Sequence, residues 1–396
     1  MTSQPILLTN VRLPNGEEAD IRIGVGQFTE IGKGLVPQSG EDLMDGGGDL
    51  VLPGFVDGHM HLDKTLTGTP WMSHRAGPTR KSRIDTERNM RSDLAPVEER
   101  ASNLVRLCIG HGTSAIRTHV DIDPSIGLKH VEALLQVRKN FADAVDMQLV
   151  AFPQSGVQSH AGMTDYLSAA IDAGVDLVGG IDPIAIDDDL DGQLDTLFAI
   201  AEKKNVGIDI HVHDPGENGL REIAGVTDRA KAHGMAKRVT ISHGFSLGAA
   251  EEGKLLKLAD QMAEAGVSLA THGGGASPLP PIKILREHGV EVFAGNDDVR
   301  DTWSPLGEGD MLERATMIAW RSGYRTDDDL LIALDCTTAA GKRVLGLPDA
   351  GITVGAPADL VTVKAEVAAE AVARHPQRKL VFKKGRIVAR DEVYDE

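Results

Sequence analysis

Residues 51–64 read Val-Leu-Pro-Gly-Phe-Val-Asp-Gly-His-Met-His-Leu-Asp-Lys. The apolar run 51–56 predicts a short buried strand that ends at Asp57. His59 and His61 follow two residues apart, and in extended backbone such residues point to the same side. Both imidazoles can therefore face one point in space, as two ligands of one metal ion must. Imidazole suits zinc, iron and copper, so the stretch indicates a candidate metal site at a strand end.

From residue 51 to about 345, apolar runs alternate with amphipathic stretches. The expected strands are 51–56, 113–121, 147–153, 175–181, 206–212, 238–243, 266–271 and 290–295. The expected helices are 97–110, 126–144, 164–174, 191–204, 218–233, 252–265, 280–288, 309–322 and 327–345. Eight strands that alternate with helices predict an α/β fold, a (β/α)8 TIM barrel. The alternative, an open doubly wound sheet, lacks its Gly-x-Gly-x-x-Gly after the first strand.

Both ends of the chain show short strand patterns joined by turn residues. The expected strands lie within 5–35 and at 351–354, 359–363, 379–383 and 386–390. Neither end alone has enough strands to be stable by itself. We therefore predict a composite β-sandwich domain from residues 1–50 and 351–396, next to a barrel domain over 51–350.

The composition excludes several classes of partner. The 396 residues carry a formal net charge of -18, so the chain is a poor binder of nucleic acid or of an anionic membrane. Its two cysteines, Cys108 and Cys336, form no CxxC pair, which disfavours disulfides and cysteine-ligated zinc. No signal peptide or membrane span is apparent, and we expect a cytoplasmic protein.

Polar, ligand-capable residues stand at every expected strand end. In parallel barrels the chemistry lies at the C-terminal ends of the strands. In chain order these ends carry His59 and His61, His119 and Asp121, Gln154, Asp182, His211 with His213 and Asp214, His243, His272, and Asp297 with Asp298. Eight such ends predict a functional metal site. His119 is expected to support or pack against that site rather than to bind the metal, and His213 either lines the pocket or packs in the core.

Several long motifs occur in a fixed order along the chain. They are Pro-Gly-Phe-Val-Asp-Gly-His-Met-His-Leu-Asp at 53–63, Arg-Thr-His-Val-Asp at 117–121, Ala-Phe-Pro-Gln-Ser-Gly at 151–156, Asp-Ile-His at 209–211, Thr-Ile-Ser-His at 240–243 and Asp-Asp-Val-Arg-Asp-Thr-Trp at 297–303. With them the chain resembles the cytosine-deaminase-like branch of the amidohydrolase superfamily. The sequence His-Leu-Asp-Lys-Thr at 61–65 looks more like the triazine-processing members that release N-alkylamines.

The resemblance implies one divalent metal ion, zinc or iron with manganese as a further candidate. Its ligands would be His59, His61, His211 and Asp297, and His243 would bind the metal or its water. Asp297 would also take the proton of the attacking water. The fourth strand ends without a lysine, so no bridging group for a second ion is expected.

The same resemblance places Gln154, Asp298 and Trp303 around the substrate. Lys64 either contacts an oxo or anionic group of the substrate or is a solvated lysine at a strand end. His272, which precedes three glycines, is a further candidate for the pocket lining.

The proton shuttle is open between two residues. The family's deaminases carry a glutamate three residues after the histidine of strand five, where this chain has Asp214, one methylene shorter. Glu217 lies three residues further on and could replace it if the loop folds back. Of the two, Asp214 is the preferred candidate.

These residues predict a metal-dependent hydrolase that attacks a small nitrogen heterocycle with metal-bound hydroxide. It would deaminate, or remove an amine from, a cytosine-like pyrimidine or an oxo-triazine. The alternatives are a dihydropyrimidinase-like ring-opening hydrolase and a non-catalytic ligand-binding barrel. The expected partner is a small heterocyclic substrate, with no nucleic acid and no membrane, and a homo-oligomer remains open.

Overall fold

Eight parallel strands form a barrel in the computed structural model, which describes residues 4–75, 77–348 and 351–395. The strands follow one another around the barrel in chain order. They are β6 (Phe55–Met60), β7 (Thr113–Asp121), β8 (Asp146–Phe152), β9 (Leu177–Ile181), β10 (Gly207–Val212), β11 (Val239–His243), β12 (Val267–Thr271) and β13 (Val292–Ala294). A parallel bridge between Met60 and Asp297 links the first and last strands. The predicted TIM-barrel fold is confirmed.

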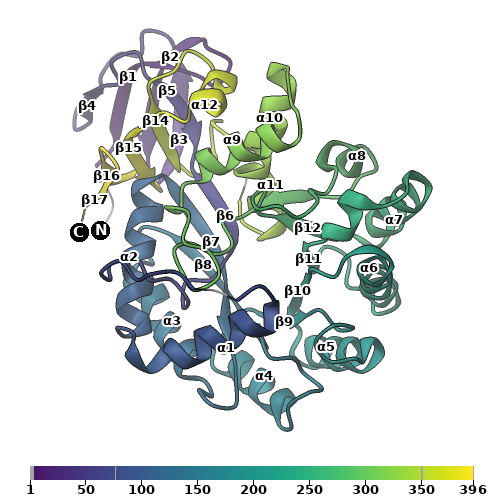
Figure 1. The fold of residues 1–396 in the computed structure, drawn as a ribbon. Coiled ribbons are helices and arrows are strands. Elements are labelled where there is room, and N and C mark those ends of the chain that lie inside the picture. The colour runs from purple at the N-terminus through teal and green to yellow at the C-terminus, as the bar shows by residue number, and fades with distance from the viewer. Residues whose placement is uncertain (1–3, 76, 349–350, 396) are drawn as a thin grey trace.

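Helices alternate with these strands and surround the barrel (Figure 1). They are α2 (Val97–Gly110), α3 (Lys129–Asn140), α4 (Met163–Asp172), α5 (Leu190–Lys204), α6 (Gly216–Ala232), α7 (Glu252–Ala265) and α8 (Ile282–Glu287), followed by α9 (Met311–Arg321), α10 (Asp327–Cys336), α11 (Ala339–Val344) and α12 (Ala368–Arg374). In α7, Leu255, Leu258 and Met262 are buried, as expected for one apolar stripe. None of the helices in the described ranges is long and apolar enough to cross a membrane.

The sequence predicted no element for the segments that form two helices, α12 and α1 (Arg80–Met90). Of these, α1 is followed by the short turn η1 (Arg91–Asp93). It begins at Thr79, whose hydroxyl accepts the backbone N–H of Ser82 while the Ser82 side chain returns to the backbone of Thr79. Only Ile84 and Glu87 of α1 are buried.

The strands at the two chain ends form one sheet apart from the barrel, where purple and yellow ribbons lie together in Figure 1. They are β1 (Ile6–Arg12), β2 (Glu18–Gly24), β3 (Gln27–Gly32), β4 (Asp42–Asp45), β5 (Leu50–Pro53), β14 (Leu360–Val363), β15 (Arg378–Lys383), β16 (Arg386–Arg390) and β17 (Val393–Tyr394). β5 joins the two ends, because it pairs with β1 on one side and with β14 on the other. Whether this sheet is an independent domain remains a prediction.

Three expected elements differ from the structure. The strand expected over 51–56 is two strands, since the chain leaves the terminal sheet at Gly54 and enters the barrel at Phe55. The helix expected over 327–345 is broken by the non-helical backbone of Thr338. Residues 351–354 form bends and the start of a turn rather than a strand, and Val354 is exposed.

Two glycines allow the first and last strands to approach closely. A Cβ on Gly58 would lie 2.3 Å from the ring of Phe293. A Cβ on Gly295 would lie 2.4 Å from the backbone nitrogen of His59. Real Cβ atoms do not tolerate such distances, so the closure of the barrel beside His59 requires glycine at both positions.

Candidate active site

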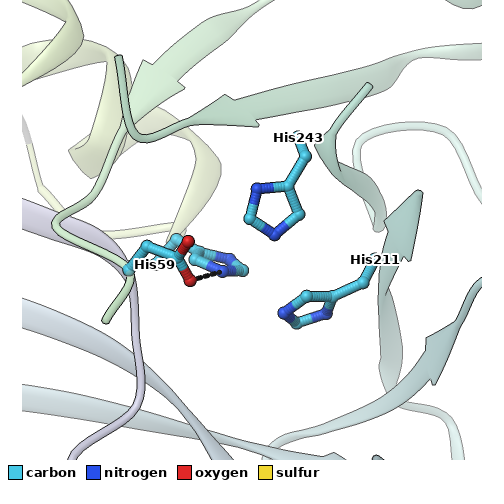
Figure 2. A group of neighbouring side chains, drawn as sticks. His59, His211 and His243 are labelled. Carbon is cyan, nitrogen blue, oxygen red and sulfur yellow. Dashed lines mark ion pairs between the residues drawn. The ribbon is translucent and has the colours of Figure 1, made fainter. Parts of the chain in front are cut away.

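Imidazoles from several strand ends converge on one carboxylate (Figure 2). Potential ligand atoms of His59, His211, His243 and Asp297 lie within 4.8 Å of one another. The Nε2 atoms of His59 and His61 are 3.2 and 3.4 Å from Oδ1 of Asp297. The Nε2 atoms of His61 and His211 are 3.3 Å apart. The structure thus brings together all five residues expected around the metal.

The backbone leaves its strand conformation at two of these residues. His243 has φ of 74° and Asp297 has φ of 62°, in the left-handed region that non-glycine residues rarely adopt. Each such residue costs about 1–3 kcal/mol, which the surrounding structure must offset. The Asp297 N–H donates to the carbonyl oxygen of His59 at 2.7 Å, and this bond holds the strained turn beside the imidazole.

The chemistry of the donor set fits a divalent metal ion. Nε2 of His59 and both ring nitrogens of His243 are buried without a hydrogen-bond partner among the described residues. Burial lowers the pKa of His61 to about 4 and lowers the pKa values of His211 and His243 well below the ordinary value. Neutral imidazoles with free lone pairs next to one carboxylate are ligands that suit zinc or iron.

A hydrogen-bond chain selects the tautomer of His59. The Ser242 hydroxyl donates to Oδ1 of Asp209 at 2.6 Å and lies 2.9 Å from Nδ1 of His59. Because that hydroxyl proton is committed to Asp209, the serine oxygen accepts from Nδ1–H and the lone pair of His59 is left on Nε2. Arg117 donates to the other oxygen of Asp209 at 3.1 Å. The sequence analysis did not assign roles to Ser242 or Asp209, although Asp209 lies two residues before His211 on the same strand face.

A second group of buried polar side chains joins residues expected around the substrate. Nζ of Lys64 bonds to Oε1 of Gln154 and lies 3.4 Å from Oδ1 of Asp121. The amide of Gln154 and the indole N–H of Trp303 donate to Oε2 of Glu87 at 3.1 and 2.9 Å. Burial alone would lower the pKa of Lys64, but Asp121 and Glu87 together raise it above the ordinary value. Lys64 is 5% exposed, so the alternative of a solvated lysine is wrong.

Two further candidates lie close to this chemistry. Burial, together with the carboxylates of Asp301 and Asp297, raises the pKa of Asp298 well above its ordinary range. The ring of His272 is 5.6 Å from the ring of His243 between centroids, and burial lowers the pKa of His272 to about 4. Nδ1 of His272 accepts the N–H of Gly274 at 3.1 Å, which fixes the first turn of the glycine loop.

The two shuttle candidates have different surroundings. Asp214 is 3% exposed, and Nη2 of Arg80 lies 2.6 Å from its Oδ1. The side chain of Glu217 is 70% exposed on α6 and forms an ion pair with Lys254 at 2.5 Å. A general acid must reach a substrate in the pocket, so this placement argues against Glu217.

The remaining histidines pack around the metal side. The ring of His119 is fully buried, with its centroid 4.4 Å from that of His59. The ring of His213 stacks on His243 at 4.2 Å, and its Nδ1 lies 2.8 Å from Oδ2 of Asp182.

Comparison with known proteins adds to this geometry. The profile described as the amidohydrolase family matches residues 42–389. This chain belongs to the amidohydrolase family. It is 34% identical over 360 residues to N-isopropylammelide isopropyl amidohydrolase of Pseudomonas sp. (strain ADP), covering 89% of each chain. It is 29% identical over 403 residues to pterin deaminase of Rhizobium rhizogenes, covering 94% of this chain and 88% of that one.

Solved structures agree with this assignment. The structure of N-isopropylammelide isopropylaminohydrolase from Burkholderia multivorans is 41% identical, with a TM-score of 0.95 over 99% of this chain and 100% of that one. The structure of 5-methylcytosine deaminase from Klebsiella pneumoniae with phosphonocytosine is 28% identical, with a TM-score of 0.86 over 99% of both chains. The chain is therefore an amidohydrolase, a hydrolytic enzyme that acts on C–N bonds, and its family typically binds a divalent metal ion.

The sequence analysis of this amidohydrolase missed the contribution of the segment between β6 and α2. That segment supplies Glu87 and Arg80, which contact residues expected in the site. It also borders a cavity of about 540 Å³, lined by Leu66, Gly68, Thr69, Pro70, Trp71, Met72, Ser73, His74, Arg75, Thr86, Met90, Arg300, Asp301, Thr302 and Pro305. None of the converging histidines lines this cavity. We therefore locate the reaction at the histidines and Asp297, where the ligand chemistry is. The available signal for α1 was the Thr79-x-x-Ser82 capping pattern.

Proposed function

We propose that this amidohydrolase cleaves the bond between a ring carbon and an exocyclic nitrogen of a small heterocycle. Its substrate would be an N-alkylated amino-oxo-triazine of the N-isopropylammelide type. One divalent ion, zinc or iron with manganese as a further candidate, would be held by His59, His61, His211 and Asp297, with His243 beside it. The observation that carries the proposal is the set of buried, partner-free imidazole nitrogens around the Asp297 carboxylate.

When bound, the ion would supply positive charge that makes water acidic near neutral pH and polarises the carbon under attack. Asp297 takes the proton of the attacking water, whose oxygen adds to the ring carbon. Asp214 delivers a proton to the exocyclic nitrogen as the C–N bond breaks. The proton that Asp297 took is returned through solvent to Asp214, and the second proton of the water stays on the ring. The products are an amine and a ring that carries a new carbonyl group.

The polar groups of the second cluster match an oxo-substituted ring. The buried ammonium of Lys64 suits an oxo or anionic oxygen, and the Gln154 amide suits a ring amide. Trp303, held by its bond to Glu87, provides a flat apolar surface beside them. Asp298 and His272 complete the polar lining. The names of the two N-isopropylammelide hydrolases, at 34% and 41% identity, support an N-alkyl leaving group.

Purified protein can test this proposal directly. Metal analysis is expected to give about one ion per chain, and release of isopropylamine from N-isopropylammelide is expected to disappear on chelation and return with zinc or iron. Cytosine, 5-methylcytosine and pterin serve as comparison substrates, with ammonia as the product measured. Two ions per active chain would contradict the ligand assignment. A metal-loaded protein that releases no amine from any of the four compounds would contradict the proposed reaction.

A further inference from the structure

One arginine of α1 bridges two carboxylates at neighbouring strand ends. Nη2 of Arg80 lies 2.6 Å from Oδ1 of Asp214, which follows β10. Nη1 of the same guanidinium pairs with Oδ2 of Asp182, which follows β9. Both carboxylates are buried, and the Arg80 side chain is 27% exposed. A single side chain from outside the barrel therefore connects α1 to the preferred proton shuttle.

Asp182 extends this connection to the metal side. Its Oδ1 accepts the backbone N–H of His213 at 2.6 Å, and its Oδ2 lies 2.8 Å from Nδ1 of the same residue. The His213 ring stacks on His243, which is one of the converging imidazoles. The path from Arg80 through Asp182 and His213 to His243 consists of direct contacts at every step.

The contacts that hold α1 on the barrel are mostly ion pairs. Its apolar anchor is Ile84, whereas Arg88 pairs with Asp123 at 2.9 Å and Arg91 pairs with Asp121 at 2.7 Å. These partners lie at or just after the end of β7, so α1 crosses the mouth of the barrel from β7 towards β10 (Figure 1). The carboxylates that these arginines contact are buried, so loss of one arginine leaves a buried charge without its partner.

We propose that Arg80 is a positioning residue that holds the Asp214 carboxylate from α1 in the orientation that proton transfer needs. This inference rests on the proposed role of Asp214. An aspartate is one methylene shorter than the glutamate expected at this position, and its carboxylate has a shorter reach from the backbone. The guanidinium fork fixes that carboxylate by a charge-assisted bond of defined geometry, which a lysine cannot reproduce.

Among the groups near Asp214, Arg80 is the main cation. These groups are Arg80 itself, Asp182, His213 and Glu222, whose free Oε2 is buried without a hydrogen-bond partner in the described chain. Burial, with Asp182 and Asp214 nearby, raises the pKa of Glu222 to about 8, so this carboxyl is neutral near pH 7 and does not compete for the guanidinium. Without Arg80, Asp214 would face a second carboxylate with no cation between them.

Amide hydrogen exchange tests the positioning independently of turnover. Arg80→Met is expected to speed exchange in two peptides, residues 80–90 of α1 and residues 212–217 around Asp214. The matched control is Arg88→Met on the same helix, whose partners are Asp123 and Ser155, and it is expected to speed exchange in 80–90 alone. Arg80→Lys keeps the charge and should give an intermediate result. Unchanged exchange over 212–217 in Arg80→Met would overturn the inference.

Kinetics with N-isopropylammelide provide the second arm. Arg80→Met is expected to lower kcat/KM about tenfold or more, because the carboxylate of Asp214 loses the guanidinium that orients it. If Arg80 acts through Asp214, the double variant Arg80→Met/Asp214→Asn is as slow as Asp214→Asn alone. If the losses of the two single variants multiply in the double variant, Arg80 acts independently of Asp214 and the inference is overturned. Full activity of Asp214→Asn, in contrast, would refute the shuttle assignment itself.

Discussion

The two sides of the site are held in different ways. On the metal side, His59, His243 and Asp297 lie at strand ends. Left-handed backbone at His243 and Asp297, and the close approach of the first and last strands at Gly58 and Gly295, fix their positions. On the opposite side, α1 contributes Arg80 and Glu87 through ion pairs and hydrogen bonds to strand-end residues. The difference teaches that the metal side depends on backbone geometry, whereas the opposite side depends on charge pairing between distant side chains. Each prediction below perturbs one side.

Removal of the Asp297 charge should have the largest effect. Asp297→Asn keeps the shape and some ligation but cannot accept a proton, and loss of general-base help costs about two to four orders of magnitude in rate. We expect the variant to stay folded, to bind metal measurably and to turn over at least about a hundredfold more slowly. Steady-state kinetics at matched metal content measures this.

The neighbouring residue is the control for that experiment. Asp298→Asn should act mainly on which substrate is accepted, since we place Asp298 in the substrate lining rather than on the metal. If Asp297→Asn kept near-full activity while Asp298→Asn was dead, the two aspartates would have been assigned in the wrong order.

Loss of the Ser242 hydroxyl should weaken the metal side without touching a ligand. Ser242→Ala leaves Nδ1 of His59 without its oxygen partner, and such outer bonds are typically worth about ten- to a hundredfold in metal affinity or activity. Competition with a chelator measures the affinity. Ser268→Ala, on the next strand, removes a buried hydroxyl that bonds to Thr240 and should leave the metal affinity unchanged. Equal losses in both variants would indicate general strand damage.

The same contrast explains what the sequence could predict. The strand ends were predictable because apolar runs locate the strands and parallel barrels carry their chemistry at one end. That pattern placed His59, His61, His211, His243 and Asp297 at one end of the barrel, and the resemblance to a known family singled them out as ligands. The strand expected over 51–56 was wrong only in its first half. Apolar character could not show that 51–53 pairs with the terminal sheet, because both sheets bury such residues.

The α1 side could not be predicted in the same way. Its helix has little apolar periodicity, since only Ile84 and Glu87 are buried, and it is held by side chains distant in sequence. Nothing local pairs Arg80 with Asp214 across 134 positions. The sequence could place Lys64 near the substrate, but not the acids Asp121 and Glu87 that keep it charged while buried.

A change at Glu87 should affect substrate binding more than the chemical step. Glu87→Gln removes the charge of the carboxylate that accepts hydrogen bonds from the Gln154 amide and the Trp303 indole N–H. Hydrogen bonds to charged groups contribute about 1.5–3 kcal/mol to stability. We expect KM for N-isopropylammelide to rise about tenfold with kcat little changed. Asp85→Asn on the exposed face of α1 is the control and should leave KM unchanged. A loss confined to kcat would instead place Glu87 in the chemical step.

Glu222 offers the smallest effect, which appears in stability rather than in rate. Burial raises its pKa from 4.5 to about 8 in the folded chain. Below pH 4.5 the carboxyl is neutral in both folded and unfolded chains. Between pH 4.5 and about 8 the unfolded chain releases the proton while the folded chain keeps it, so this group lowers the free energy of unfolding as the pH rises.

Glu222→Gln abolishes that titration and keeps the size of the side chain. Its carbonyl oxygen can still accept the N–H of Ile184, which Glu222 accepts at 2.9 Å, and its amide can donate towards Asp182 and Asp214. We expect a Tm higher than wild type by a few degrees at pH 8 and nearly equal at pH 4.5, measured by calorimetry. Glu217→Gln, exposed on the same helix, should show no such pH dependence. A gain of equal size at both pH values would mean that the amide improves the hydrogen bonding, and that the Glu222 carboxyl is not held neutral beneath Arg80.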